Sequence, residues 1–310
     1  MDTNLLRSDH KQWRYLFMKA GVGLAIVYYL FYKIGFTAIF VTFKQFTFWH
    51  VFIVLLSTIV VVILGAYNVS LLLQSLSYQI PIMRLIRYSL VSWSLGLFVP
   101  GKLGELSIVY FWKKHGVPLG PGFAVALMDK LITFMTLSVV TLIGIFIFFR
   151  HQFWLFVSIL LVLVLGGLCV VSPYGRELIK KYILRRYKTQ VVGLSKTFFL
   201  LVRKYPHLLF LNMVLTVIKW LISAYAFYLL LAYFQPPVSF LYTFIIICTS
   251  IIVSLIPISI SGLGIREGVA VYLFSLVGVL QNYALSVSVL FTVLGYIIAS
   301  LSILLLHSLI

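Results

Sequence analysis

Residues 97–105 read Leu-Phe-Val-Pro-Gly-Lys-Leu-Gly-Glu, and residues 256–268 read Ile-Pro-Ile-Ser-Ile-Ser-Gly-Leu-Gly-Ile-Arg-Glu-Gly. The first stretch interrupts a hydrophobic region at 85–112, and the second interrupts one at 240–278. Each contains a proline, closely spaced glycines, a cation and then a glutamate. Proline stops a helix and glycine lets the backbone turn, so each region is predicted to form two half-helices joined by a non-helical elbow. We call residues 97–105 the first elbow and residues 256–268 the second elbow.

The composition on either side of the elbows is that of a membrane protein. Of 310 residues, 63% are hydrophobic and 10% are charged, and the mean hydropathy is +1.13. These polar side chains are too few to cover a water-soluble globule of this size. The sequence therefore predicts a single all-α integral membrane domain over residues 1–310, because a spanning helix needs about 20 mainly apolar residues and such runs recur along the chain. The runs predicted to cross fully are Trp13–Phe36, Phe48–Leu76, Gly122–Phe149, Phe153–Ser172, His207–Phe234 and Tyr283–His307.

Positive charge orients these spans. The chain has 24 Lys and Arg against 6 Asp and Glu, a formal net charge of +18. In a membrane protein, Lys and Arg in loops mark the cytoplasmic face, so we expect no nucleic-acid partner. The predicted cytoplasmic loop, about 173–206, carries Arg176, Lys180, Lys181, Arg185, Arg186, Lys188, Lys196, Arg203 and Lys204. Both termini are then also cytoplasmic, since six crossings return the chain to its starting side. An alternative explanation for the many basic residues of the loop is that they bind anionic lipids.

The two elbows are expected to lie at membrane depth. Backbone without helical hydrogen bonds is tolerated there only where it is buried in protein or lines a wet cavity, so the elbows should approach each other inside the bundle. If each hairpin returns to its own side, the first enters from the cytoplasm and the second from outside. Opposed re-entrant helical hairpins in the two halves of a chain are the sequence sign of an inverted-repeat transporter.

Three acidic residues fall at membrane depth: Glu105, Asp129 and Glu267. An ionisable group inside a bilayer is costly unless it is paired or hydrated, so a functional site is the default interpretation. The alternative is that ion pairs, Lys102 with Glu105 and Arg266 with Glu267, merely hold the hairpins together.

The cations of the elbows suit an anionic ligand. Lys102 and Arg266 each lie where a new half-helix should begin, and free N–H groups and the helix dipole favour a phosphate at such a place. Lys219 lies mid-span and should point into the same interior, as a third phosphate contact or as a partner for an acid. Asn68 and Asn212 are interpreted as helix-to-helix hydrogen bonds. No metal-ligand, nucleotide-binding or hydrolase motif occurs, so we expect no metal and no cofactor.

Two motifs carry a resemblance to a known family. Pro100-Gly-Lys-Leu-Gly-Glu105 matches the pattern PGRxGE, and Gly262-Leu-Gly-Ile-Arg-Glu-Gly268 matches GGLGxREG with Ser261 in place of the first glycine. At these motifs the chain resembles the lysylphosphatidylglycerol synthase transmembrane family, the flippase-like module found alone or fused to an aminoacyl-lipid synthase in multiple peptide resistance factors. That family also shows an ERxxD-like stretch; here residues 129–133 keep the cation as Lys130 but have Thr133 in place of the second acid.

The resemblance implies translocation of an anionic, aminoacylated or polyprenyl-phosphate-linked lipid between leaflets. The sequence closes at 307–310 without a synthase domain, so we expect a transporter and no synthesis. The residues predicted to bind substrate are Lys102, Glu105, Asp129, Lys130, Lys219, Arg266 and Glu267. Those predicted to shape the elbow backbone are Pro100, Gly101, Gly104, Pro257, Gly262, Gly264 and Gly268.

Two alternatives stay open. One is a membrane-embedded transferase, or an accessory subunit, in lipid-linked glycan or aminoacyl-lipid synthesis. The other is an ion or small-solute carrier, since opposed re-entrant hairpins also build ion pathways. We expect the protein to lie in the bacterial inner membrane and to bind a membrane lipid, or a solute if it is a carrier. The sequence leaves open whether a separate synthase or glycosyltransferase is a partner. It also leaves open whether the protein forms a homo-oligomer.

Overall fold

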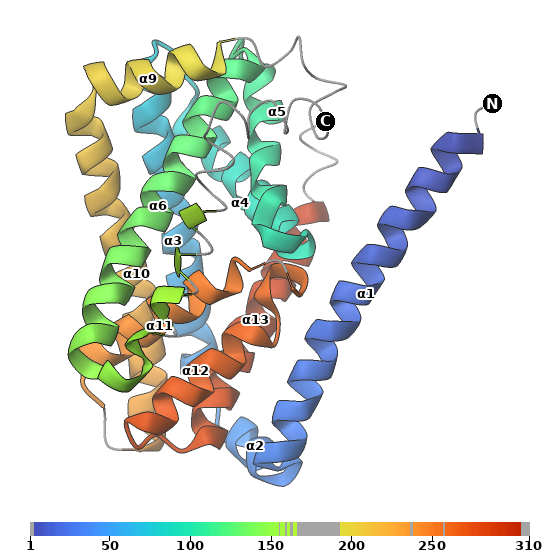
Figure 1. Ribbon diagram of the computed structural model, residues 1–310, viewed down its shortest axis with the longest axis vertical. Coiled ribbons are helices and arrows are strands. Elements are labelled where there is room, and N and C mark those ends of the chain that lie inside the picture. The colour runs from blue at the N-terminus through green and yellow to red at the C-terminus, as the bar shows by residue number, and fades with distance from the viewer. Residues whose placement is uncertain are drawn as a thin grey trace. The chain divides into compact units, whose positions relative to one another are not determined.

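The computed structural model describes residues 3–154, 156–158, 160–161, 164–165, 193–235, 238–256 and 258–304. Every regular element in this part of the chain is helical (Figure 1). The helices long and apolar enough to cross a membrane are α1 (Thr3–Ile34), α3 (Phe48–Ser75), α6 (Leu119–Phe148), α10 (Pro206–Phe234) and α13 (Gln281–Leu304), with α1 contributing its part Phe17–Ile34. The prediction of an all-α polytopic membrane protein is confirmed.

These helices correspond to five of the predicted crossings. Most of the sixth, at 153–172, lies outside the described residues, as do 173–192 of the predicted basic loop. The described end of that loop is helical, because α9 (Leu194–Lys204) buries Leu201 and packs on α6. A short helix, α2 (Phe36–Lys44), was not predicted; it is separated from α1 by Gly35, whose φ of 102° no ordinary residue adopts readily.

Both interrupted regions are broken helices. The first consists of α4 (Ile82–Phe98), the 3-10 helix η1 (Pro100–Ser107) and α5 (Ile108–Lys113). The second consists of α11 (Phe240–Ser254), the 3-10 helix η3 (Ile260–Gly262) and α12 (Ile265–Leu276). The remaining described element is the 3-10 turn η2 (Arg150–Gln152).

In both regions the chain turns back on itself. The ring of Tyr88 on α4 stacks on that of Phe111 on α5, with centroids 5.1 Å apart. In the second region α12 packs against α11 and also against α13 (Figure 1). The stacked rings of Phe227 and Phe274, 5.4 Å apart, join α10 to the same group of helices. The breaks therefore occur where the proline and glycine pattern predicted and let each region fold back on itself, while re-entrant insertion into the membrane stays a prediction.

The chain divides into two compact units, each assembled from separated segments. Unit 1 contains Met1–Val60, Leu90–Glu105 and Ile222–Ile310, and unit 2 contains Val61–Ser89 and Leu106–Leu221. Both elbows belong to unit 1, although about 150 residues of sequence separate them.

Candidate functional site

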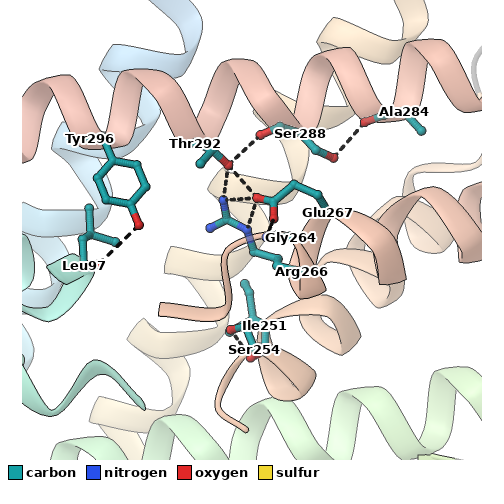
Figure 2. Close-up of polar contacts among 10 residues, drawn as sticks. All are labelled: Leu97, Ile251, Ser254, Gly264, Arg266, Glu267, Ala284, Ser288, Thr292 and Tyr296. Carbon is teal, nitrogen blue, oxygen red and sulfur yellow. Dashed lines mark hydrogen bonds and ion pairs between the residues drawn. The ribbon is translucent and has the colours of Figure 1, made fainter. Parts of the chain in front are cut away.

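The second elbow holds a buried carboxylate, that of Glu267, whose side chain is 1% exposed. Its Oε2 accepts a hydrogen bond from the backbone N–H of Gly264 at 2.7 Å. Its Oε1 accepts from Nη2 and Nε of Arg266, at 2.8 and 3.2 Å, and from the hydroxyl of Thr292 at 2.6 Å (Figure 2). Nη2 of Arg266 also donates to the Thr292 hydroxyl. Both carboxylate oxygens are thus satisfied, which is what allows this charge to be buried.

This arrangement changes the expectation for the start of α12. Arg266 is the second residue of that helix, as predicted, but one of the free N–H groups there, that of Gly264, is already bonded to an anion, the protein's own Glu267. The glutamate forms one half of a capping box with the glycine before the helix. Arg266 and Glu267 therefore form the ion pair that the sequence analysis raised as an alternative, and a further role of Arg266 in binding a substrate stays a prediction. The Arg266 side chain as a whole remains 32% exposed, in contrast to that of Glu267.

Helix α13 contacts both elbows. Thr292 binds the ion pair of the second elbow, and Tyr296, one turn later, donates from its hydroxyl to the carbonyl of Leu97 at 3.3 Å (Figure 2). The ring of Tyr296 also packs on that of Phe98, with centroids 5.6 Å apart. Residues four apart lie on one face of a helix. One face of α13 therefore carries the start of the first elbow and the ion pair of the second.

Sequence reasoning missed Thr292 and Tyr296, because both lie inside an apolar span. A signal was present, since polar residues recur every fourth position at Ser288, Thr292 and Tyr296. Such a polar stripe in a spanning helix marks the face that meets other protein.

The first elbow is wound more tightly than predicted. Lys102 was expected at the start of an α-helix but lies in the 3-10 helix η1, six residues before α5 begins at Ile108, and its φ is 57°. A Cβ on Gly104 would overlap the backbone of Leu95, and a Cβ on Gly96 would overlap the side chain of Glu105. The two arms of this hairpin touch through these glycines, which leaves no space for a side chain at either position.

The glycines of the second elbow also allow close contact with neighbouring backbone. Gly262, at φ 75°, lies against the backbone of Ser254, the last residue of α11. Gly264, at φ 80°, lies against α1, where an added Cβ would be 2.8 Å from the carbonyl oxygen of Gly23. Close backbone approach through small residues is how helices associate inside membranes. Of the two other predicted elbow residues here, Gly268 lies within α12 and Pro257 lies outside the described residues.

The other predicted site residues lie in unit 2. Asp129 is buried, with Oδ2 3.7 Å from Nζ of Lys130, whose own side chain is 46% exposed. Nδ2 of Asn212 donates to Oδ1 of Asp129 at 3.3 Å, which is a helix-to-helix hydrogen bond of the kind predicted. Lys219 is buried on α10. The structure thus brings Lys102, Glu105, Arg266 and Glu267 into one unit, and places Asp129, Lys130 and Lys219 in the other.

Comparison with known protein families gives a match over nearly the whole chain. The model of the family described as "Lysylphosphatidylglycerol synthase TM region" matches residues 16–302. The chain belongs to this family. A comparison with curated proteins gives no match. Family membership carries a membrane, lipid-related function, and the match includes both elbows and nearly all of helix α13.

The structure explains why the family's glycine-rich second motif has glycine at its first position. The pattern GGLGxREG places glycine where this member of the lysylphosphatidylglycerol synthase transmembrane family has Ser261, and Ser261 has φ 50° and ψ 23°. This left-handed conformation is costly for any residue with a Cβ. The Ser261 hydroxyl is also buried and contacts no hydrogen-bonding group in the described part of the chain.

Ser261→Gly should therefore stabilise the protein by about 1 kcal/mol, through relief of left-handed strain. The matched control is Ser259→Gly, because Ser259 has an equally unpartnered buried hydroxyl but an extended backbone, with φ −119°. Thermal unfolding of the purified protein in detergent is the measurement, and Ser261→Gly should unfold at the higher temperature of the two variants. Equal shifts in both would show that the conformation of Ser261 is unstrained.

Proposed function

We propose that this protein moves a lipid with an anionic or phosphate-bearing headgroup between the leaflets of its membrane. The observation that supports the proposal best is the arrangement on α13, where Thr292 and Tyr296 hold the two elbows against one helical face. Each elbow brings one cation of the predicted substrate-binding set, Lys102 or Arg266. Two cations in one unit of a membrane protein suit a headgroup phosphate, while the acyl chains stay in the bilayer.

Arg266 has donors for two anions at once. A guanidinium carries five N–H groups in a planar fork. In this structure Nε and Nη2 are directed at Glu267 and Thr292, whereas Nη1 takes part in neither contact. Glu267 therefore fixes the orientation of the fork, and the exposed side of the guanidinium is left to bind phosphate oxygens. A lysine could not divide its donors in this way, because an ammonium is a point charge without a fixed fork.

The proposal includes the topology expected from the sequence. The two hairpins are re-entrant and enter from opposite sides, with both termini and the basic loop in the cytoplasm. In this arrangement, helix α13 is the common support on which the elbows move relative to one another. Exposure of the headgroup site to one leaflet and then to the other follows from that movement.

Transport by the purified chain in liposomes tests the function. We expect a headgroup-labelled anionic phospholipid to cross between leaflets faster than in protein-free liposomes. Tyr296→Phe should slow the crossing, because it removes the hydrogen bond to the first elbow, whereas Tyr225→Phe, at a side chain that is 53% exposed, should not. Absence of lipid movement would contradict the proposal. A covalently altered lipid would indicate a transferase instead, and ion flux without lipid movement would indicate a carrier.

A further inference from the structure

Unit 2 contains a buried polar cluster that the proposed headgroup site does not use. Asn68 from α3, Asp129 from α6, and Asn212 and Thr216 from α10 are each at most 4% exposed. Nδ2 of Asn212 lies 3.3 Å from Oδ1 of Asp129 and 3.4 Å from the carbonyl oxygen of Asn68. Nδ2 of Asn68 lies 3.2 Å from the hydroxyl oxygen of Thr216. We call these four residues the amide cluster.

The amide cluster has more oxygen atoms than the protein satisfies. The side-chain oxygens of Asn68 and Asn212 are fully buried, and neither meets a hydrogen-bond donor in the described part of the chain. The hydroxyl oxygen of Thr133 is equally buried and unpartnered, and Thr133 lies one turn after Asp129 on the same face of α6. Exchanging the amide nitrogen and oxygen of Asn212 does not help, because its oxygen would then face two other oxygens. Buried oxygens without donors require a positively charged or hydrogen-donating ligand.

The charge of the amide cluster selects the ligand. Asp129 supplies one negative charge, and its neighbour Lys130 offsets it only weakly, since the Lys130 side chain is 46% exposed and Nζ lies 3.7 Å away. Lys219, a buried cation of α10, has its Nζ over the Trp220 ring at 5.9 Å. Divalent metal sites in proteins use several carboxylates or imidazoles, and no group of three such residues occurs in the described part of the chain. One carboxylate among neutral oxygens fits a hard cation with a single charge.

We propose that the amide cluster binds one monovalent metal cation, Na⁺, within unit 2. The ligands are the carboxylate of Asp129 and the side-chain oxygens of Asn68 and Asn212, with the hydroxyl of Thr133 completing the set from α6. The cation neutralises a carboxylate held inside a membrane helix and joins α3, α6 and α10. Its ligands include neither of the cations proposed to bind phosphate, Lys102 and Arg266, so the site is tested without any measurement of lipid transport.

Binding of ²²Na⁺ to the purified full-length chain in detergent is the direct experiment. We expect saturable binding of one ion per chain, and a thermal unfolding temperature that rises with NaCl but not with N-methylglucamine chloride at equal ionic strength. Asp129→Asn and Asn212→Leu should each weaken binding at least tenfold. Ser138→Ala is the matched control, since it removes another buried and unpartnered hydroxyl of α6 that lies outside the amide cluster, and it should bind Na⁺ normally.

Several outcomes would overturn the proposal. Equal unfolding temperatures in all salts together with no ²²Na⁺ binding would mean that the unpartnered oxygens bind water only. Full binding by Asp129→Asn would place the ion elsewhere, and saturation by methylammonium but not by Na⁺ would assign the site to an amine. If Asp129→Asn does not fold, Asn212→Asp decides: a second carboxylate should shift the preference from Na⁺ towards Ca²⁺, and an unchanged preference counts against the site.

Discussion

Replacing Arg266 with glutamine should destabilise the protein by about 3 kcal/mol, because it leaves the charge of Glu267 buried without its partner. Glu267 has a 1% exposed side chain, and Arg266 supplies two of the hydrogen bonds to its Oε1. The Gly264 N–H and the Thr292 hydroxyl remain, but two neutral donors do not replace a full positive charge. Thermal and denaturant unfolding in detergent measure the loss. Unchanged stability would mean that Glu267 does not depend on Arg266.

The double variant Arg266→Gln with Glu267→Gln separates folding from transport. Removing both charges should restore most of the stability, since a buried pair replaced as a whole strands neither partner. If Arg266 binds the lipid phosphate, transport in liposomes should still fall about tenfold or more, the effect of losing one charge-assisted hydrogen bond. Arg266→Lys should be intermediate, because lysine keeps the charge but cannot bind Glu267 and a phosphate through one planar fork. Full transport by a stable double variant would leave the pair with a structural role alone.

Gly262→Ala is expected to destabilise the protein by about 3 kcal/mol, the sum of left-handed backbone strain and a forced shift of tightly packed atoms. Gly262 has φ 75°, and the added methyl group would overlap the Cβ and backbone of Ser254 on α11. The overlap is with backbone rather than with the end of a flexible side chain, so no rotamer change relieves it. Lipid transport by the Gly262→Ala variant should fall together with its stability, because the hairpin can no longer close at its tip.

Gly268→Ala is the control for this substitution. Gly268 belongs to the same motif, but it lies within α12, and its added methyl group would lie 3.8 Å from the Leu30 side chain, an ordinary contact. Alanine is also favoured over glycine inside a helix, so this variant should be neutral or slightly more stable. If Gly262→Ala unfolds at the same temperature as Gly268→Ala, the elbow does not pack on α11 as described.

The elbows show how much of this structure the local sequence can predict. Proline, glycine and the change from apolar to polar residues predicted where both helices break, and the structure has 3-10 helices at 100–107 and 260–262. The type of turn was not predictable in the same way. The first elbow is a 3-10 helix in which Gly104 packs against the Leu95 backbone, a contact that depends on how the two arms of the hairpin meet.

In the candidate site, the sequence identified the charged residues but missed the hydroxyl residues that contact the elbows. Charge in an apolar context was enough to select Lys102, Glu105, Arg266 and Glu267, since ionisable residues are rare inside membranes and stand out in the sequence. Thr292 and Tyr296 did not stand out, because an uncharged hydroxyl costs little in a membrane helix and occurs in many apolar spans.

The sequence by itself determined that this protein is all-helical and embedded in a membrane, where two helices break, and to which family it belongs, because apolar length, proline and glycine act locally along the chain. Only the tertiary structure decided which charges share a unit. Asp129 and Lys219 look equivalent to the elbow charges in sequence, yet they belong to unit 2 while both elbows belong to unit 1. That division arises from how helices far apart in the chain pack together, and side-chain shape at those contacts is not written in the hydrophobic pattern of any one segment.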